Sequence, residues 1–179
     1  FILNEGEHLS ILAIDGAKEC CIELNSMSKS HNMPGWRVGM LAANAEFVSW
    51  ILKVKSNIDS GTFRAVQLAA AAAMDNDEDW HREHNVRRYA ERRTLAESIM
   101  QALGCRFDRA QTGLFLWGRI PDALADAEEL TERALHEADV FITPGGIFGQ
   151  NGRRYVRISL CADENRMSEA LARIQNVFA

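Results

Sequence analysis

The chain has 179 residues, a mass of 20.1 kDa and a formal net charge of −5, from 20 basic and 25 acidic side chains. Nucleic acids and anionic membrane surfaces attract a concentrated basic face, so this balance argues against both as the main partner. Hydrophobic residues are 47% and charged residues 25% of the chain, as in an ordinary soluble globular protein. The longest apolar run, residues 68–74, is much shorter than the roughly 20 residues that span a bilayer.

The cysteines indicate no metal site and no disulfide framework. They are Cys20, Cys21, Cys105 and Cys161. No C-x-x-C pair occurs among them, and this usage is typical of a reducing, cytoplasmic compartment. Cys20 and Cys21 are adjacent in a predicted strand, so we expect them to be buried or half-buried. His81 and His84 share a helix face but lack a third ligand at suitable spacing, so no metal site is predicted.

The first part of the chain predicts an α/β arrangement. Residues 20–24 and 38–43 are apolar and predict two short strands, the second one buried. Asn44 precedes apolar residues at helical spacing and predicts the start of a helix. The alanine-rich run at residues 62–74 predicts a close-packed buried helix.

An acidic run at residues 75–79 is the clearest change in composition along the chain. We place a domain boundary there, which gives one domain of residues 1–75 and another of residues 76–179. A long helix is predicted from Trp80 to Leu103, ended by Gly104. Its expected packing side consists of Val86, Ala90, Leu95 and Ile99, and its expected solvated side of Arg87, Arg88, Arg92 and Arg93.

The remaining residues predict a small α+β domain with an antiparallel sheet and helices on one side. Its predicted strands cover residues 105–107, 114–117, 140–143 and 155–160. Its predicted helices cover residues 123–137 and 164–178. A glycine-rich loop at residues 144–152 has no nucleotide-binding pattern, so we interpret it as a structural turn.

A polar segment after the first predicted strand contains candidate catalytic chemistry. Ser26, Ser28 and Lys29 lie just past the strand end, where α/β proteins bind ligands, and Arg37 follows eight residues after the lysine. A partly desolvated lysine amine forms Schiff bases with aldehydes, and an arginine with a serine hydroxyl binds a phosphate dianion. Pyridoxal phosphate requires both groups. Spacing alone leaves the alternative of a surface lysine in a polar loop, with Arg37 in an ordinary ion pair.

The run at residues 25–39, NSMSKSHNMPGWRVG, resembles the cofactor-lysine signature of the class I/II aminotransferases, which are fold-type I pyridoxal phosphate-dependent enzymes. The resemblance implies that Lys29 forms the Schiff base with the cofactor and moves a proton at the substrate α-carbon. It also implies that Ser26 and Arg37 hold the cofactor phosphate, with Ser28 in the same site.

The segment at residues 153–160 is similar to the family's closing strand, whose arginine binds the substrate α-carboxylate. Alternation in this strand lets Val156, Ile158 and Leu160 face the core while Arg157 faces the other way. Arg157 could then bind a carboxylate through both arms of its guanidinium. Without the Lys29 motif, a charged residue on a solvated sheet face would be an equal alternative.

The resemblance runs from about Leu9 to the end and matches the C-terminal part of family members. It implies a fold-type I α/β transferase in which residues 1–75 are the C-terminal part of the large pyridoxal phosphate domain and residues 76–179 are the small domain. The expected activity is amino-group transfer between an amino acid and a 2-oxo acid by a cytoplasmic homodimer. We expect this truncated chain itself to be inactive.

Two other functions stay open. Some members of the same fold are lyases that catalyse β-elimination, and they share these motifs. An aminotransferase-like module can also be the ligand sensor of a regulator, although this chain has no basic helix-turn-helix segment. The sequence does not identify the amino acid substrate.

Overall fold

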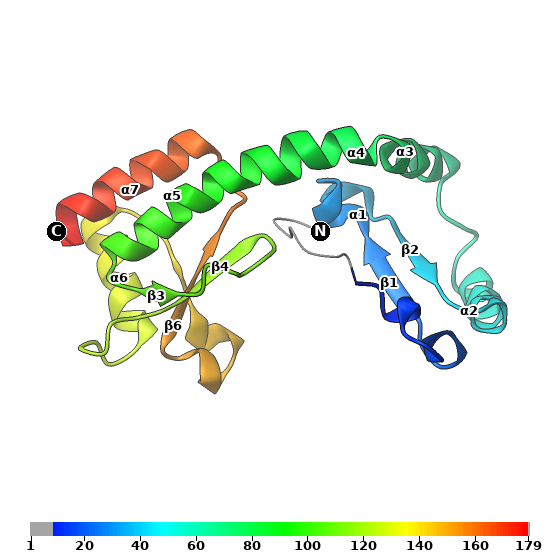
Figure 1. The fold of residues 1–179 in the computed structure, drawn as a ribbon, viewed down its shortest axis with the longest axis horizontal. Coiled ribbons are helices and arrows are strands. Elements are labelled where there is room, and N and C mark those ends of the chain that lie inside the picture. Colours follow the sequence, from blue (N-terminus) through cyan, green and yellow to red (C-terminus); the bar gives the residue numbers. More distant parts are fainter. Residues whose placement is uncertain (1–8, 179) are drawn as a thin grey trace. The chain divides into compact units, whose positions relative to one another are not determined.

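The computed structural model describes residues 9–178, which form two compact units divided between Arg82 and Glu83. Figure 1 shows their helices and strands in chain order. None of the helices in the described part is long and apolar enough to cross a membrane. The predicted boundary after residue 75 lies within the first unit, and the roles given to the two predicted domains stay predictions.

The first unit contains a two-stranded antiparallel sheet and several helices. The strands are β1 (Glu23–Ser26) and β2 (Gly39–Ala42), with Ser26 opposite Gly39. The helical elements are the 3-10 turns Ile11–Ala13, Ala17–Glu19 and Pro34–Trp36 and the helices α1 (Met27–Ser30), α2 (Ala45–Ile58), α3 (Arg64–Asp75) and α4 (Asp77–Trp80). Asn44 caps α2 as predicted, because its Oδ1 accepts a hydrogen bond from the Phe47 N–H at 2.9 Å.

The first predicted strand starts too early. Residues 17–19 form a 3-10 turn, and the backbone N–H groups of Cys20 and Cys21 both donate to the Ala17 carbonyl. These hydrogen bonds keep the cysteines out of the strand pairing, which begins at Glu23. Cys20 is exposed and Cys21 is half-buried, so the expected burial is wrong for Cys20.

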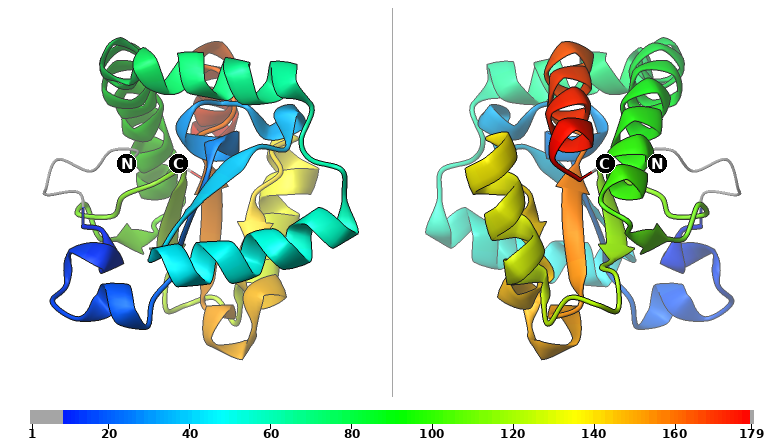
Figure 2. Two further views of the ribbon diagram at one scale, coloured as in Figure 1. Left: turned by 90° about the vertical axis from the view of Figure 1, so that its right-hand side faces the viewer. Right: turned by 90° about the vertical axis from the view of Figure 1, so that its left-hand side faces the viewer.

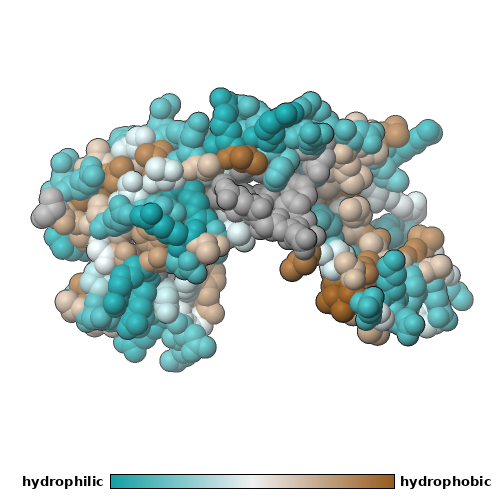
Figure 3. Space-filling view, viewed as in Figure 1, coloured by the Kyte–Doolittle hydropathy of each residue, from teal (hydrophilic) through white to brown (hydrophobic). Residues whose placement is uncertain are grey.

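The predicted burial of β2 and α3 is also wrong. Residues 39, 40 and 42 of β2 are exposed, and Ala70 is the buried residue of α3. The described core of this unit consists of Met27, Met33 and Ala70, with Val38 and Ala73 partly buried. A two-stranded sheet covers little apolar surface, so Leu24 and Ile58 are 75% and 78% exposed. Figure 3 shows apolar groups at the molecular surface.

The second unit is a four-stranded antiparallel sheet with helices packed on one face. Its strands, in the order β3-β4-β6-β5, are β3 (Arg106–Phe107), β4 (Phe115–Arg119), β6 (Tyr155–Ser159) and β5 (Thr143–Pro144). Its helices are α5 (Tyr89–Ala102), α6 (Ala127–Ala138) and α7 (Glu164–Phe178), and Figure 2 shows them beside one another over the strands. The predicted antiparallel sheet with helices on one side is confirmed.

Alternation along β4 and β6 separates a core face from an open face of this sheet. Leu116, Val156 and Ile158 are buried against the helices, as is Leu160 just after β6. The predicted core positions of the last strand are therefore confirmed. The helices contribute Ala96, Ile99, Met100, Leu130, Ala134, Met167 and Ile174 to the same core. Arg157 lies on the open face.

The predicted helix over residues 80–103 is observed as an unbroken run of helical residues that falls in three elements, the first of which, α4, ends at Trp80. Residues His81–Arg88 form a π-helical segment, which contains the boundary between the units, and α5 follows it. Gly104 ends α5 as predicted, and its φ of +70° explains the choice of glycine. The predicted packing residue Val86 is 52% exposed. The buried side of α5 is formed by Ala96, Ile99 and Met100, of which the sequence predicted Ile99.

The prediction that Arg92 and Arg93 are solvated is wrong. The Arg92 Nε donates to Glu164 Oε1 at 2.8 Å, and the Arg93 Nε donates to Glu97 Oε1 at 2.9 Å. Their side chains are only 15% and 13% exposed. A guanidinium has five N–H donors, so it can satisfy carboxylate and carbonyl partners at the edge of a core. Helix α5 therefore packs through its arginines as well as through its apolar residues.

The start of α6 and the length of β5 also differ from the predictions. Helix α6 begins at Ala127 because the Asp126 Oδ1 accepts a hydrogen bond from the Glu129 N–H at 3.1 Å. This hydrogen bond and Arg153, at 3.3 Å, hold the pKa of the Asp126 carboxyl below its ordinary value. Of the predicted strand at residues 140–143, only Thr143 pairs in β5.

In the loop after β5, the backbone of Gly145 lies close to the backbone of Gly152 and Tyr155. This close approach predicts a difference in stability between two glycine-to-alanine variants. A Cβ atom on Gly145 would collide with the Gly152 carbonyl oxygen and would lie 2.6 Å from the Tyr155 carbonyl oxygen. We expect Gly145→Ala to lower the free energy of unfolding by roughly 1–3 kcal/mol, because the backbone must shift. Gly146→Ala is the matched control, since its Cβ would meet only the flexible Glu128 side chain. Urea denaturation measures both variants, and equal losses would contradict this account.

Candidate functional site

The turn between β1 and α1 carries three of the predicted site residues. Ser26 ends β1 and caps α1, because its Oγ accepts a hydrogen bond from the Ser28 N–H at 3.2 Å. Serine is a preferred residue at this capping position, so the local sequence itself favours the turn. Lys29 follows in α1, where its residue is exposed and forms no ion pair within the described part of the chain.

Arg37 lies between α1 and β2. It follows the 3-10 turn Pro34–Trp36, and its φ of +50° is uncommon for a residue with a side chain. The exposed guanidinium donates from Nη1 to the Pro34 carbonyl at 2.8 Å. The next residue, Val38, accepts a hydrogen bond from the Met27 N–H at 3.2 Å. This hydrogen bond brings Arg37 to the same end of the two-stranded sheet as the turn that contains Lys29.

A shallow pocket of about 340 Å³ opens beside this turn. Its walls come from both strands and consist of Leu24, Asn25, Ser26, Gly39, Met40 and Leu41. Gly39 allows the strands to approach closely, since a Cβ there would lie 2.5 Å from the Asn25 carbonyl oxygen. The structure thus places the predicted cofactor residues at one end of the sheet, while their roles in binding stay predictions.

Arg157 lies in the interior of the second sheet, on its open face. Its neighbours across the strands are Trp117 of β4 and Thr143 of β5. The Arg157 Cζ is 4.2 Å from the centre of the Phe115 ring and 4.3 Å from the centre of the Phe148 ring. The Arg157 Nε is buried and has no hydrogen-bond partner among the described residues.

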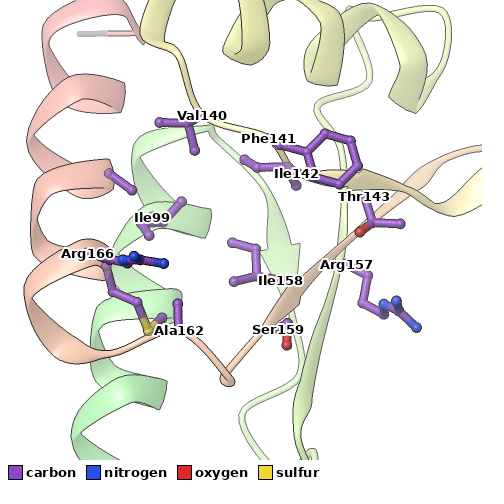
Figure 4. Close-up of a pocket in the computed structure, with 12 residues that line it drawn as sticks. Ile99, Val140, Phe141, Ile142, Thr143, Arg157, Ile158, Ser159, Ala162 and Arg166 are labelled. Carbon is purple, nitrogen blue, oxygen red and sulfur yellow. The ribbon is translucent and has the colours of Figure 1, made fainter.

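A second pocket, of about 290 Å³, lies beside β6. Most of its lining is apolar and includes Ile99, Val140, Ile142, Ile158, Met167 and Ala170. Figure 4 shows Ile158 pointing into this pocket and the Arg157 guanidinium pointing away from it. Arg166 also lines it and lies 3.7 Å from Asp163. Arg157 is itself one of the residues that line this pocket, so the candidate carboxylate site on the open face borders it.

Sequence reasoning missed Phe115 and Phe148 as neighbours of Arg157. Alternation within the strand at residues 114–117 could have placed Phe115 on one face, but the register that puts this face beside Arg157 is a tertiary property. Phe148 ends the 3-10 turn Gly145–Phe148, and no local signal shows where that turn directs the ring. Lys29 belongs to the first unit and Arg157 to the second.

The fold is that of the fold-type I aminotransferases, as the solved structures that it matches show. It matches apo-BacF from Bacillus subtilis with a TM-score of 0.83 and 31% identity, over 98% of this chain and 44% of that chain. It also matches a probable N-succinyldiaminopimelate aminotransferase from Thermus thermophilus with a TM-score of 0.79 and 33% identity, over 97% of this chain and 46% of that chain.

The sequence comparison is more specific. Residues 4–174 match the family described as aminotransferase class I and II, and the chain belongs to that family. It is 40% identical over 171 residues to the LL-diaminopimelate aminotransferase of Nitratidesulfovibrio vulgaris. This match covers 94% of this chain and 43% of that protein. The chain thus spans less than half the length of the curated relatives that it matches.

Proposed function

We propose that the protein carrying this sequence is a pyridoxal phosphate-dependent aminotransferase, which moves an amino group between an amino acid and a 2-oxo acid. The observation that carries the proposal is the capped turn that presents Lys29 beside Ser26 and Ser28, in a chain of this family. Because the chain covers 43% of the relative's length, the activity of the whole protein is part of the proposal.

The donor set at this turn fits pyridoxal phosphate. The exposed Lys29 amine can reach an aldehyde, and hydroxyls with a guanidinium are suitable donors for a phosphate dianion. The Ser26 Oγ accepts the Ser28 N–H, but a hydroxyl keeps its own proton for donation. No carboxylate of the described residues forms an ion pair with Arg37, whose recorded side-chain partner is the Pro34 carbonyl.

Each of these residues has a defined role in the proposed reaction. Bound pyridoxal phosphate would supply an electron sink that stabilises negative charge at the substrate α-carbon. Lys29 would bind the cofactor aldehyde, and its amine would move the proton at the α-carbon. Ser26, Ser28 and Arg37 would hold the phosphate. Arg157 would orient the substrate by donating two hydrogen bonds to its α-carboxylate.

The names of two relatives suggest which amino acid to test. One is an LL-diaminopimelate aminotransferase and the other a probable N-succinyldiaminopimelate aminotransferase. We therefore propose a role in amino acid biosynthesis, with LL-diaminopimelate as the first substrate to assay. The cytoplasmic homodimer, the large-domain assignment of residues 1–75 and the small-domain assignment of residues 76–179 belong to the same proposal and follow from the family resemblance.

Reductive labelling tests the cofactor assignment. The protein is mixed with pyridoxal phosphate and reduced with borohydride, and the modified peptides are mapped by mass spectrometry. We expect the label at Lys29, its loss in Lys29→Ala and its retention in Lys53→Ala, since Lys53 is an exposed residue of α2 outside the turn. Label scattered over several lysines, or unchanged in Lys29→Ala, would contradict the proposal.

Product analysis then separates the two candidate reactions. Transamination gives a 2-oxo acid and a new amino acid, whereas elimination releases ammonia.

A further inference from the structure

Two phenylalanine rings from separate elements contact the Arg157 guanidinium. Phe115 belongs to β4, and Phe148 ends the turn after β5. Their ring centres lie 4.2 and 4.3 Å from the Arg157 Cζ, well within the distance of about 6 Å at which a cation is attracted by a ring face. Both rings therefore contribute to holding this cation in one orientation.

The arginine has no acidic partner within the described part of the chain. A carboxylate partner would hold the guanidinium in place, but it would occupy the same N–H donors that a substrate carboxylate needs. Ring faces attract the positive charge without accepting those donors in conventional hydrogen bonds. The buried Arg157 Nε has no hydrogen-bond partner among the described residues, so no acceptor in this part of the chain occupies that donor.

The position of the Phe148 ring is supported by neighbouring aromatic residues. Trp117 lies edge-on to Phe148, with ring centres 5.8 Å apart, and stacks on Tyr155 at 5.4 Å. A Cβ on Gly145, at the start of the same turn, would lie 2.8 Å from Trp117 Cη2. Yet Phe115 and Phe148 are 39% and 51% exposed, so burial in the core does not explain their placement beside the cation.

We propose that Phe115 and Phe148 are positioning residues that hold the Arg157 guanidinium with its donors available for a carboxylate. This inference rests on the proposed function for the identity of the bound carboxylate, whereas the contact between the rings and the cation stands on the geometry. The two rings act through Arg157 and carry no chemical step themselves.

Nuclear magnetic resonance of the 179-residue chain tests the contact directly. Rotation about the Nε–Cζ bond of Arg157 is measured in the wild type and in Phe115→Leu and Phe148→Leu. We expect each variant to speed this rotation roughly 2- to 5-fold, because each removes one cation–ring attraction. Phe148→Tyr keeps an aromatic ring at this position, so the Nε–Cζ rotation in this variant should have the wild-type rate. Phe141→Leu is the control, since Phe141 is 73% exposed and the two ring contacts of Arg157 in the described part of the chain are made by Phe115 and Phe148. Unchanged rotation in both leucine variants would overturn the inference.

Steady-state kinetics separates this inference from the proposed function. In a full-length family protein carrying this sequence, Phe115→Leu and Phe148→Leu should raise KM for both the amino acid and the 2-oxo acid roughly 2- to 5-fold, with kcat unchanged. Arg157→Ala should raise both KM values more strongly. If Arg157→Ala leaves KM unchanged, the proposed role of Arg157 fails. If Arg157→Ala raises KM but neither phenylalanine variant does, the positioning inference alone fails.

Discussion

Lys29→Ala is expected to lower kcat/KM for transamination by roughly 10²- to 10⁴-fold or more in a full-length family protein carrying this sequence, because it removes the group that moves the proton. The substitution should leave the fold intact, since Lys29 is exposed and has no ion-pair partner in the described part of the chain. Steady-state assay with LL-diaminopimelate and a 2-oxo acid measures the activity, and thermal unfolding measures the stability.

Lys29→Arg is the informative companion variant. Arginine keeps the positive charge and much of the length of the side chain, but it stays protonated in proteins and cannot act as a nucleophile. We therefore expect it to be as inactive as Lys29→Ala, whereas Lys53→Ala on α2 should keep wild-type activity. Activity retained in Lys29→Arg would mean that the charge of this residue matters rather than its amine chemistry, and would exclude the proposed role.

The parts of the structure that the sequence predicted are those with strong local signals. Asn44 precedes an apolar face at helical spacing, and it caps α2. Residues 155–160 alternate between apolar and polar side chains, and the apolar set is buried. Gly104 lies at a positive φ at the helix end. Each of these features depends on a few neighbouring residues, so the sequence contains what determines it.

The predictions that failed depended on contacts between distant residues or on competition between signals. Pro121 and Asp122 can start a helix, but Asp126 forms the capping hydrogen bond, so α6 begins at Ala127. Arg92 and Arg93 carry charges that suggest solvent, yet their acceptors make partial burial possible. For the candidate site, the sequence placed Lys29 and Arg157 by motif, but the ring of Phe148 reaches Arg157 through a turn whose direction has no local signal.

The two units are expected to differ greatly in resistance to local unfolding. Residues 83–178 enclose a core from three helices and the sheet, including fully buried Met100, Leu116 and Ile174. The described part of the first unit has three buried residues in its apolar cluster. We expect backbone amides of β4 and β6 to exchange with solvent roughly a thousandfold more slowly than those of β1 and β2, measured by hydrogen exchange on this chain.

Hydrogen exchange in a core variant and in a full-length protein tests this difference between the two units further. Ile174→Ala removes a buried side chain of α7, so it should lower protection in the second unit by roughly 2–5 kcal/mol while β1 and β2 stay unchanged. Leu135→Ala is the control on α6, because Leu135 is 36% exposed.

In a full-length family protein, amides of β1 and β2 should become protected, since further strands can pair with their edges and cover their apolar faces. Equal protection of both units in the present chain would show that the small core around Met27 is sufficient, and that the first unit needs no such partner.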